Sequence, residues 1–222
     1  DGGKDSSAGS DAGNSSTKSL LTWNVKMTRI AAGDLDGDGI ADLVVSSAEQ
    51  KVTERLSLVS VKRVQGSSPT FSEMASSVTL PDPVAATGLL DAEGDGDLDM
   101  VAVVSTGQDR LLLNDGKGRY FDDTTASMPV DNSTGTNVSV ADLDMDGKID
   151  VLISNSGSMN RLYVHGDGTR LQDETTALPL ETMQTIAMLP FDADGDGDLD
   201  LIVINGKAPK VKLLVSTEMS KK

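Results

Sequence analysis

An acidic segment of nine residues recurs four times along this chain at nearly constant spacing. The copies begin at Asp34, Asp91, Asp142 and Asp192, and they read DLDGDGIAD, DAEGDGDLD, DLDMDGKID and DADGDGDLD. Successive starts are 57, 51 and 50 residues apart. This periodicity predicts a repeat protein, in which neighbouring units bury a continuous core because no unit can bury its apolar face alone.

Strand-like sequence surrounds each acidic segment. The runs LVVSS, MVAVVS, VLISNS and LIVIN follow the four copies directly, and no helical period of useful length is present. The second and third units also match further on, where RLLLNDGKGRYFDDTTASMP from Arg110 resembles RLYVHGDGTRLQDETTALPL from Arg161. Each unit is therefore predicted to hold a strand, the acidic loop, a second strand, a hairpin closed by a glycine-containing turn, and a last strand that ends near proline. Four strands in about 50 residues predict one blade of an all-β propeller.

The repeats divide the chain into a tail and four blades. Residues 1–17 contain nothing more apolar than alanine, so this Ser/Gly/Asp-rich segment is predicted to be a flexible tail. Residues 18–222 are predicted to form the β-propeller, with approximate blades at 26–80, 84–130, 136–180 and 185–222.

The two ends of the repeat region determine how the propeller could close. The last unit ends in VKLLVSTEMSKK, which supplies a third strand but no clear fourth. Residues 18–25, which include the stretch SLLTWNV, could complete this last blade and remove an exposed strand edge. This count of strands favours a closed four-bladed ring. The alternatives are that the chain is part of a larger propeller, or that two chains share one ring.

The spacing of the acids within each loop indicates metal binding. Acids occupy positions 1, 3, 5 and 9 of every copy, and position 6 is always glycine, at Gly39, Gly96, Gly147 and Gly197. Carboxylates at alternating positions converge on one point only where the chain curls tightly, and glycine permits that bend. A calcium ion at the centre would turn the repulsion between these carboxylates into ligation, so we expect up to four Ca²⁺ ions, one per loop.

Calcium prefers six to eight oxygen ligands, and each loop can supply them. We expect the side chains at positions 1, 3 and 5, the backbone carbonyl at position 7 and a bidentate carboxylate at position 9. The second site is expected to be looser, or to bind through a water, because its position 3 is Glu93. The predicted ligands are Asp34, Asp36, Asp38, Ile40 and Asp42 in the first loop, Asp91, Glu93, Asp95, Asp97 and Asp99 in the second, Asp142, Asp144, Asp146, Lys148 and Asp150 in the third, and Asp192, Asp194, Asp196, Asp198 and Asp200 in the fourth.

Other interpretations of the loops fit less well. An EF-hand places its bidentate acid at position 12 between helices, whereas position 12 here is apolar in every copy. Plain polar turns would explain one copy but not four with the same phase. Magnesium retains its waters and requires a strict octahedron, which makes calcium the better candidate.

The motif DxDxDGxxD followed by an apolar strand resembles the FG-GAP, or VCBS-type, repeats of integrin α-subunit propellers and of many secreted proteins. It is carried by Asp34–Asp42, Asp142–Asp150 and Asp192–Asp200, and with Glu93 substituted by Asp91–Asp99. The resemblance covers most of the chain after the tail and implies a β-propeller with a calcium ion in a hairpin loop of each blade. The usual ring of that family has seven blades whereas this chain has four repeats, and the FG and GAP signatures themselves are poorly represented.

Composition excludes several classes of function. With 35 acidic and 19 basic residues the formal net charge is −16, which argues against nucleic acid and anionic membranes as partners. Zero cysteines exclude disulfides and thiolate metal sites. No membrane-spanning run and no signal peptide are recognisable. The chain is not expected to be an enzyme, since no nucleophile, base or phosphate loop remains once the acids are assigned to metal, and the single histidine, His165, is expected to be a solvated turn residue.

These observations favour a binding function outside the cell. The leading hypothesis is an extracellular calcium-binding propeller that serves as a protein interaction or adhesion module. Site affinities of about 10⁻⁴ to 10⁻³ M, as in other extracellular modules, would suit millimolar calcium. A carbohydrate-binding propeller is the alternative, weakened by an aromatic content of 3%. A third hypothesis is a structural subunit of a surface assembly that self-associates. The partner is thus expected to be a protein or glycan, or the chain itself.

Overall fold

The computed structural model describes residues 29–46, 56–62, 70–74, 80–166, 168 and 170–216. Within these ranges the regular structure is almost entirely β, with one short helix, α1 (Thr124–Ser127), and one 3₁₀ turn, η1 (Thr175–Ala177). The predicted tail at 1–17 and the segment 18–25 that could complete the last blade lie outside the described residues.

Fifteen strands make up the described structure, and they form four antiparallel meanders. Blade 1 contains β1 (Arg29–Gly33), β2 (Asp42–Ser46), β3 (Leu56–Lys62) and β4 (Thr70–Glu73); blade 2 contains β5 (Val84–Leu90), β6 (Asp99–Val104), β7 (Arg110–Asn114) and β8 (Tyr120–Asp122); blade 3 contains β9 (Gly135–Ala141), β10 (Asp150–Ser158), β11 (Arg161–His165) and β12 (Leu171–Asp173); and blade 4 contains β13 (Met183–Phe191), β14 (Asp200–Asn205) and β15 (Val211–Leu214).

Each blade follows the predicted order of elements. The first and second strands are joined by the acidic loop, the second and third by a hairpin, and in blades 1 to 3 a fourth strand pairs with the third. Blade 4 has three strands within the described part of the chain, as the sequence of the last repeat predicted. A short irregular pairing of Ser156 and Ser158 in β10 with Gln184 and Met183 in β13 links blades 3 and 4 into one extended sheet.

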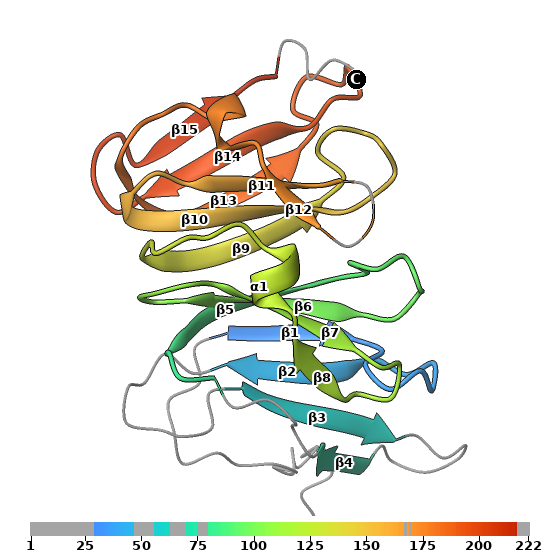
Figure 1. The fold of residues 1–222 in the computed structure, drawn as a ribbon. Coiled ribbons are helices and arrows are strands. Elements are labelled where there is room, and N and C mark those ends of the chain that lie inside the picture. The colour runs from blue at the N-terminus through green and yellow to red at the C-terminus, as the bar shows by residue number, and fades with distance from the viewer. Residues whose placement is uncertain are drawn as a thin grey trace, which may run out of the picture.

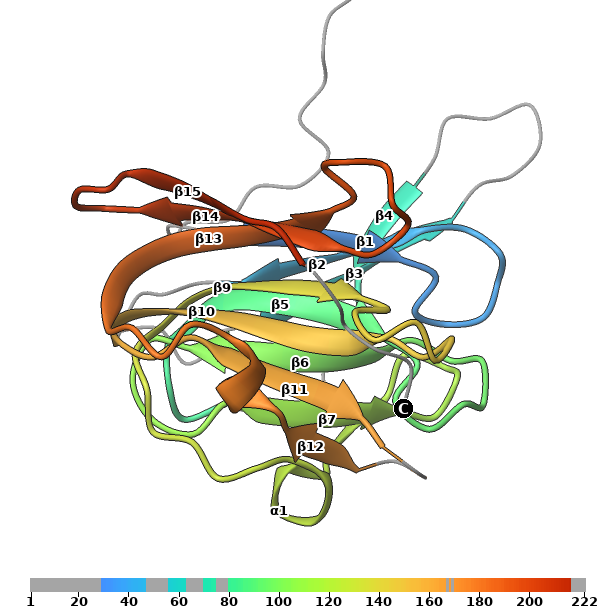
Figure 2. The same ribbon diagram turned by 90° about the horizontal axis from the view of Figure 1, so that it is seen from above.

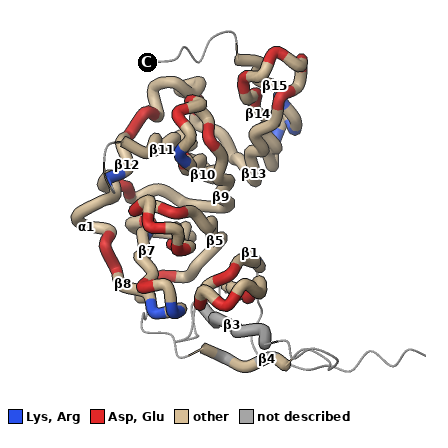
Figure 3. The backbone as a smooth tube through the Cα atoms, turned by 90° about the vertical axis from the view of Figure 1, so that its right-hand side faces the viewer, with Lys and Arg blue, Asp and Glu red and all other residues tan. Residues whose placement is uncertain are grey.

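The blades stack in chain order (Figure 1). The first strands β1, β5, β9 and β13 contact one another in that sequence. In the view along the stack, the strands of blades 2 and 3 follow one another in the same direction, from β5 to β7 and from β9 to β12 (Figure 2). Figure 3 shows the outer strands radiating from this line of first strands, with blades 1 and 4 at the two ends of an open arc. The four-bladed propeller is therefore confirmed, and in the described residues it is an arc that does not close on itself.

The core lies between neighbouring blades and explains the continuous apolar runs after each acidic loop. In β6, Met100 and Ala102 pack toward blade 1, whereas Val101 and Val103 pack toward blade 3. All four side chains are fully buried. Because a central blade is covered on both faces, alternation of polar and apolar residues disappears from its inner strands. Such burial of both faces is the main source of stability in stacked repeats.

Candidate metal site

The four acidic loops occupy equivalent places in the fold. Each one joins the first strand of its blade to the second, so the loops of β1–β2, β5–β6, β9–β10 and β13–β14 lie at the same edge of the four sheets. Figure 3 looks toward this edge and shows acidic segments recurring from blade to blade. The repeat therefore sets the same cluster of carboxylates on each of four rigid strand pairs.

Two residues in every loop adopt the left-handed conformation that makes the chain curl. At position 6 the backbone angle φ lies between 81° and 96° in all four glycines, which confirms the bend predicted there. A Cβ at these glycines would meet nothing within 4 Å, so conformation and not crowding requires glycine. Position 4 has the same sign of φ, and it holds Gly37, Gly94 and Gly195 in three loops but Met145 in the third. The role of position 4 was not apparent from the sequence, because this position is not glycine in every copy.

Replacing Met145 with glycine is expected to stabilise the protein by about 0.5–1 kcal/mol. Met145 has φ 59°, a region that costs a residue with a Cβ about 1–2 kcal/mol, and the entropy of glycine offsets part of that gain. Urea denaturation of Met145→Gly measures the change. Gly147→Ala, with φ 89° two residues away, is the matched control and should destabilise. A loss of stability in Met145→Gly would contradict the assignment of strain.

The carboxylate at position 1 organises the loop. Asp91 accepts hydrogen bonds from the backbone N–H groups of Gly94 (2.7 Å), Asp95 (3.1 Å) and Gly96 (2.9 Å). The position 1 aspartates of the other loops also accept N–H groups from within their own loops. These bonds hold the loop curled around its first residue and turn the remaining carboxylate oxygens toward the same space.

The aspartate at position 9 connects the loop to the body of the blade. Asp99 is fully buried, and its two oxygens accept the N–H groups of Ala92 in the loop and Asn114 at the end of β7, both at 2.8 Å. Asp150 and Asp200 make the same two contacts in blades 3 and 4. Burial raises the pKa of Asp99 to about 6, although the two N–H groups act in the opposite direction. Position 9 is thus a structural tie as well as a predicted ligand.

Three of the four loops bring carboxylate oxygens together at distances suited to one cation. In each of these groups the oxygens lie within 4.8 Å of one another, and the groups are Asp34, Asp36 and Asp42 in the first loop, Asp142, Asp144 and Asp146 in the third, and Asp192, Asp194 and Asp200 in the fourth. In the third loop, Oδ1 of Asp142 is buried without a hydrogen-bond partner, as a metal ligand would be. The donor set, all carboxylate oxygen, fits calcium.

The remaining predicted ligands are placed less closely. In the described residues the second loop forms no such group. A slight loss of hydration, with the nearby carboxylates of Asp95 and Asp123, raises the pKa of Glu93, although the residue is exposed. At position 5, Asp38, Asp95, Asp146 and Asp196 each accept the N–H of position 7, which is Ile40, Asp97, Lys148 and Asp198. The side chain of Lys148 extends to the carbonyl of Gly166 at 2.7 Å, so it braces the loop against the neighbouring turn. Coordination by the position 7 carbonyls stays a prediction.

The expectation that His165 is a solvated turn residue was wrong. The residue ends β11 with 5% of its surface exposed, its backbone N–H donates to Asp150, and its Nε2 lies 3.0 Å from the carbonyl of Gly168. The corresponding Asn114 donates its side-chain amide to the carbonyl of Leu35 in the first acidic loop. Both side chains are buried, and each binds loop backbone: Asn114 that of the first acidic loop and His165 that of the turn between β11 and β12.

A buried polar cluster lies at the opposite end of blades 2 and 3 and was not foreseen. Asp131 forms an ion pair with Arg161 at 3.1 Å, and its other oxygen accepts the hydroxyl of Ser133. Asp109 accepts the N–H of Val104, while its second oxygen is buried without a partner. Burial raises the pKa of Asp109 to about 7, and the charge of Asp131 acts in the same direction.

Asp109 is expected to make the folded state less stable as pH rises. The pKa of this carboxyl is 3.8 in the unfolded chain and about 7 in the folded chain. The free energy of unfolding therefore falls as the pH rises from about 4 to 7, and it stays reduced at higher pH. Asp109→Asn removes the buried charge and should be about 2 kcal/mol more stable than the wild type at pH 8, with little difference at pH 4. Chemical denaturation across this range, in chelator, checks the profile. The exposed Asp115→Asn serves as control, and equal profiles for wild type and Asp109→Asn would contradict the prediction.

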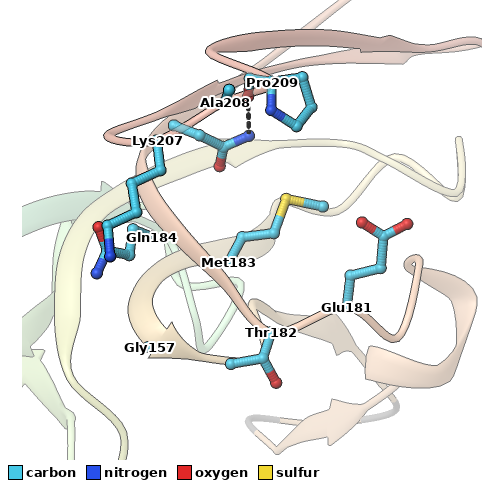
Figure 4. Close-up of a pocket in the computed structure, with 9 residues that line it drawn as sticks. Gly157, Glu181, Thr182, Met183, Gln184, Lys207, Ala208 and Pro209 are labelled. Atoms are coloured by element: carbon cyan, nitrogen blue, oxygen red, sulfur yellow. Dashed lines mark hydrogen bonds between the residues drawn. The ribbon is translucent and has the colours of Figure 1, made fainter.

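A pocket of about 450 Å³ lies at the edge of the sheets away from the acidic loops. It is formed where β13 begins and where the β14–β15 hairpin turns, and its wall includes Glu181, Met183, Gln184 and Lys207. Figure 4 shows the side chain of Met183 between Glu181 on one side and Gln184 and Lys207 on the other. Asn205 donates to the carbonyl of Pro209 at 3.1 Å and fixes the hairpin above it. No residue of the lining is aromatic.

Comparison with known proteins relates this geometry to a family. A model described as FG-GAP-like repeat matches residues 91–153 and 142–203, and one described as FG-GAP repeat matches 28–52. No curated relative matches at a significant level. A solved structure, described as the basis of specific recognition of non-reducing terminal N-acetylglucosamine by an Agrocybe aegerita lectin, is similar over 82% of this chain and 48% of that chain, with 16% identity and a TM-score of 0.46. The chain thus spans about half the length of that lectin. Because the FG-GAP-like matches together span residues 91–203, more than half of the chain, this protein belongs to the FG-GAP repeat family.

Proposed function

We propose that this protein is an extracellular, calcium-binding propeller that acts as a protein interaction or adhesion module. The observation that carries the proposal is the repetition of one acidic loop, tied to its blade by a buried aspartate, at the same edge of every sheet. Such a loop is a stabilising element, because its first aspartate bonds the backbone of the loop itself and its last aspartate bonds the end of the third strand.

Calcium ions in these loops support a location outside the cell. Millimolar calcium saturates sites with dissociation constants of about 10⁻⁴ to 10⁻³ M, whereas the cytosol would leave them empty. The net charge of −16 is concentrated in the loops and would be lowered by each bound ion. Within the described residues, no helix could cross a bilayer.

The ligand surface that we propose is the edge opposite the loops. The pocket there combines a carboxylate, an ammonium group, an amide and the thioether of Met183, a mixture that suits a polar protein segment. A glycan is the alternative ligand, since Gln184 and Thr182 could bind hydroxyl groups, but the lining has no ring on which a sugar could stack. We propose a binding role and no catalytic one.

Binding to cell surfaces tests this function directly. Fluorescently labelled protein, in 2 mM Ca²⁺ or in chelator, is applied to cells before and after protease treatment and after enzymatic deglycosylation, and to a glycan array. The proposal predicts calcium-dependent staining that protease treatment abolishes and deglycosylation does not change. Lys207→Glu should lose the staining, whereas the control Lys117→Glu, at the edge that carries the acidic loops, should retain it. Staining removed by deglycosylation, with a matching array signal, would favour the glycan ligand. Absence of staining by folded, calcium-loaded protein would reject the proposal.

A further inference from the structure

Among the described residues, blade 4 presents an apolar sheet face that no other blade covers. Leu189, Ile202 and Leu213 are cross-strand partners in β13, β14 and β15, and they form one row of this face. Ile204 and Val211 are paired in the next row. Of these side chains, Leu189, Leu213 and Val211 are 58%, 51% and 61% exposed. An exposed contiguous apolar patch of this kind marks an interaction surface.

The same face is buried wherever another blade follows. The residues of blade 2 equivalent to Ile202 and Leu213 are Val101 and Leu111, and both are fully buried. In blade 3 the equivalents are Leu152 and Leu162, which pack on blade 4 with at most 2% exposure. The exposed face of blade 4 therefore has the composition and the strand positions of a surface built to receive a following blade.

Gly88, the equivalent of Leu189 in blade 2, confirms the direction of this face. A Cβ at Gly88 would lie 2.9 Å from a side-chain carbon of Val140 in blade 3, so this position points at the next blade in the arc. In blade 4 the position points into solvent, and it carries a leucine.

Blade 1 presents the opposite half of the same contact. Met100 and Ala102 of β6 are the residues with which blade 2 receives blade 1, and their equivalents in β2 are Leu43 and Val45. On the same face of blade 1, Ile30 in β1 is 64% exposed and pairs with Val45. Of these three residues of blade 1 only Ile30 is exposed, since Leu43 is half-buried and Val45 is 5% exposed. Three contacts of the type that would join the two ends of the arc already exist within the chain.

We propose that a second copy of this chain covers both faces: blade 1 of each copy packs on blade 4 of the other, and the two arcs close one ring of eight blades. The two contacts are identical and related by a twofold axis, so the assembly terminates and leaves no apolar face exposed. Eight blades lie within the range of known closed propellers. Association continues the blade packing already present and requires no new type of interface.

The mass of the protein in solution tests the proposal. Light scattering in millimolar calcium is expected to give twice the chain mass of 23.1 kDa. Leu213→Asp, which places a charge on the exposed face of blade 4, and Ile30→Asp, which does so on blade 1, should each halve the mass to that of a monomer while circular dichroism stays unchanged. Val130→Asp is the matched control, because Val130 is 87% exposed but lies between α1 and β9, away from both faces.

Mixing the two variants distinguishes this arrangement from others. Leu213→Asp retains an intact blade 1 face and Ile30→Asp retains an intact blade 4 face, so the mixture regains one good contact and forms a pair that neither variant forms alone. A monomeric wild type would overturn the proposal. So would an Ile30→Asp variant that stays dimeric, since blade 4 would then meet blade 4, and so would open chains of growing mass.

Discussion

Calcium is expected to raise the melting temperature of this protein by roughly 10 °C or more over the chelated state. A site with a dissociation constant of about 10⁻⁴ to 10⁻³ M contributes about 1.4–2.7 kcal/mol at 10 mM calcium, and in a chain of this size each kcal/mol raises the melting temperature by roughly 2–4 °C. Three loops already hold their carboxylate oxygens within 4.8 Å of one another, so the contributions of these three sites to the stability should add. Without the ion, repulsion among these acids loosens the edge of every blade.

Thermal melts in calcium, in chelator, and in magnesium at matched ionic strength check this expectation. The magnesium sample separates specific ligation from general screening of the −16 charge. Calorimetric titration should find three comparable sites and a weaker second-loop site, and Glu93→Asp should strengthen the weak one by restoring the motif. A melt that calcium does not shift, on protein first freed of metal, would contradict the assignment of the loops.

Asp99→Asn is expected to destabilise the protein by about 2–4 kcal/mol, even in the absence of calcium. Both oxygens of Asp99 accept buried backbone N–H groups at 2.8 Å, from Ala92 and Asn114. The substitution keeps the volume but turns one acceptor into a donor that faces an N–H, which leaves a buried polar group unsatisfied. Denaturation in chelator measures the structural part of the effect alone.

Asp95→Asn is the matched control for this change. Asp95 belongs to the same loop and is exposed, and its side chain accepts a hydrogen bond from the N–H of Asp97 within that loop. In chelator its stability should stay within about 0.5 kcal/mol of the wild type, since exposed substitutions cost little. In calcium both variants should lose affinity at the second site. Equal stabilities for the two variants in chelator would show that position 9 acts only as a ligand.

The architecture was predictable because its cause is local and repeated. The apolar runs after Asp42, Asp99, Asp150 and Asp200 became β2, β6, β10 and β14, and the missing fourth strand of the last unit is missing within the described part of blade 4. Closure was not predictable in the same way. Curvature of the arc depends on the packing of one blade against the next, as at Gly88 and Val140, and such contacts between distant residues leave no periodic pattern.

The acidic loops were easier to predict from the sequence than the contacts that connect them to the blades. In three of the four loops the acids at positions 1 and 3 lie close together, because their spacing brings them together on a curled backbone. The connection from Asp99 to β7 could not be foreseen, since its partner is a backbone N–H at Asn114 and carries no side-chain signal. Nothing in the sequence around Asp109 marks it as a buried residue. Part of its environment, Asp131 and Arg161, comes from residues that follow blade 2 in the chain.

In the described part of the chain the main contacts of each blade are with its neighbours in sequence, so the energetics of the fold are close to one-dimensional. Within a single chain, as in the monomeric Leu213→Asp variant, blades 2 and 3 are held from both sides and blades 1 and 4 from one, so opening should begin at the ends of the stack and move inward. The amide hydrogens of β6 and β10 should then be the slowest in the protein to exchange with solvent, and those of β15 among the fastest. A chain of this design can lengthen or shorten by whole blades, because losing a terminal unit exposes a surface that the next unit was already shaped to fill.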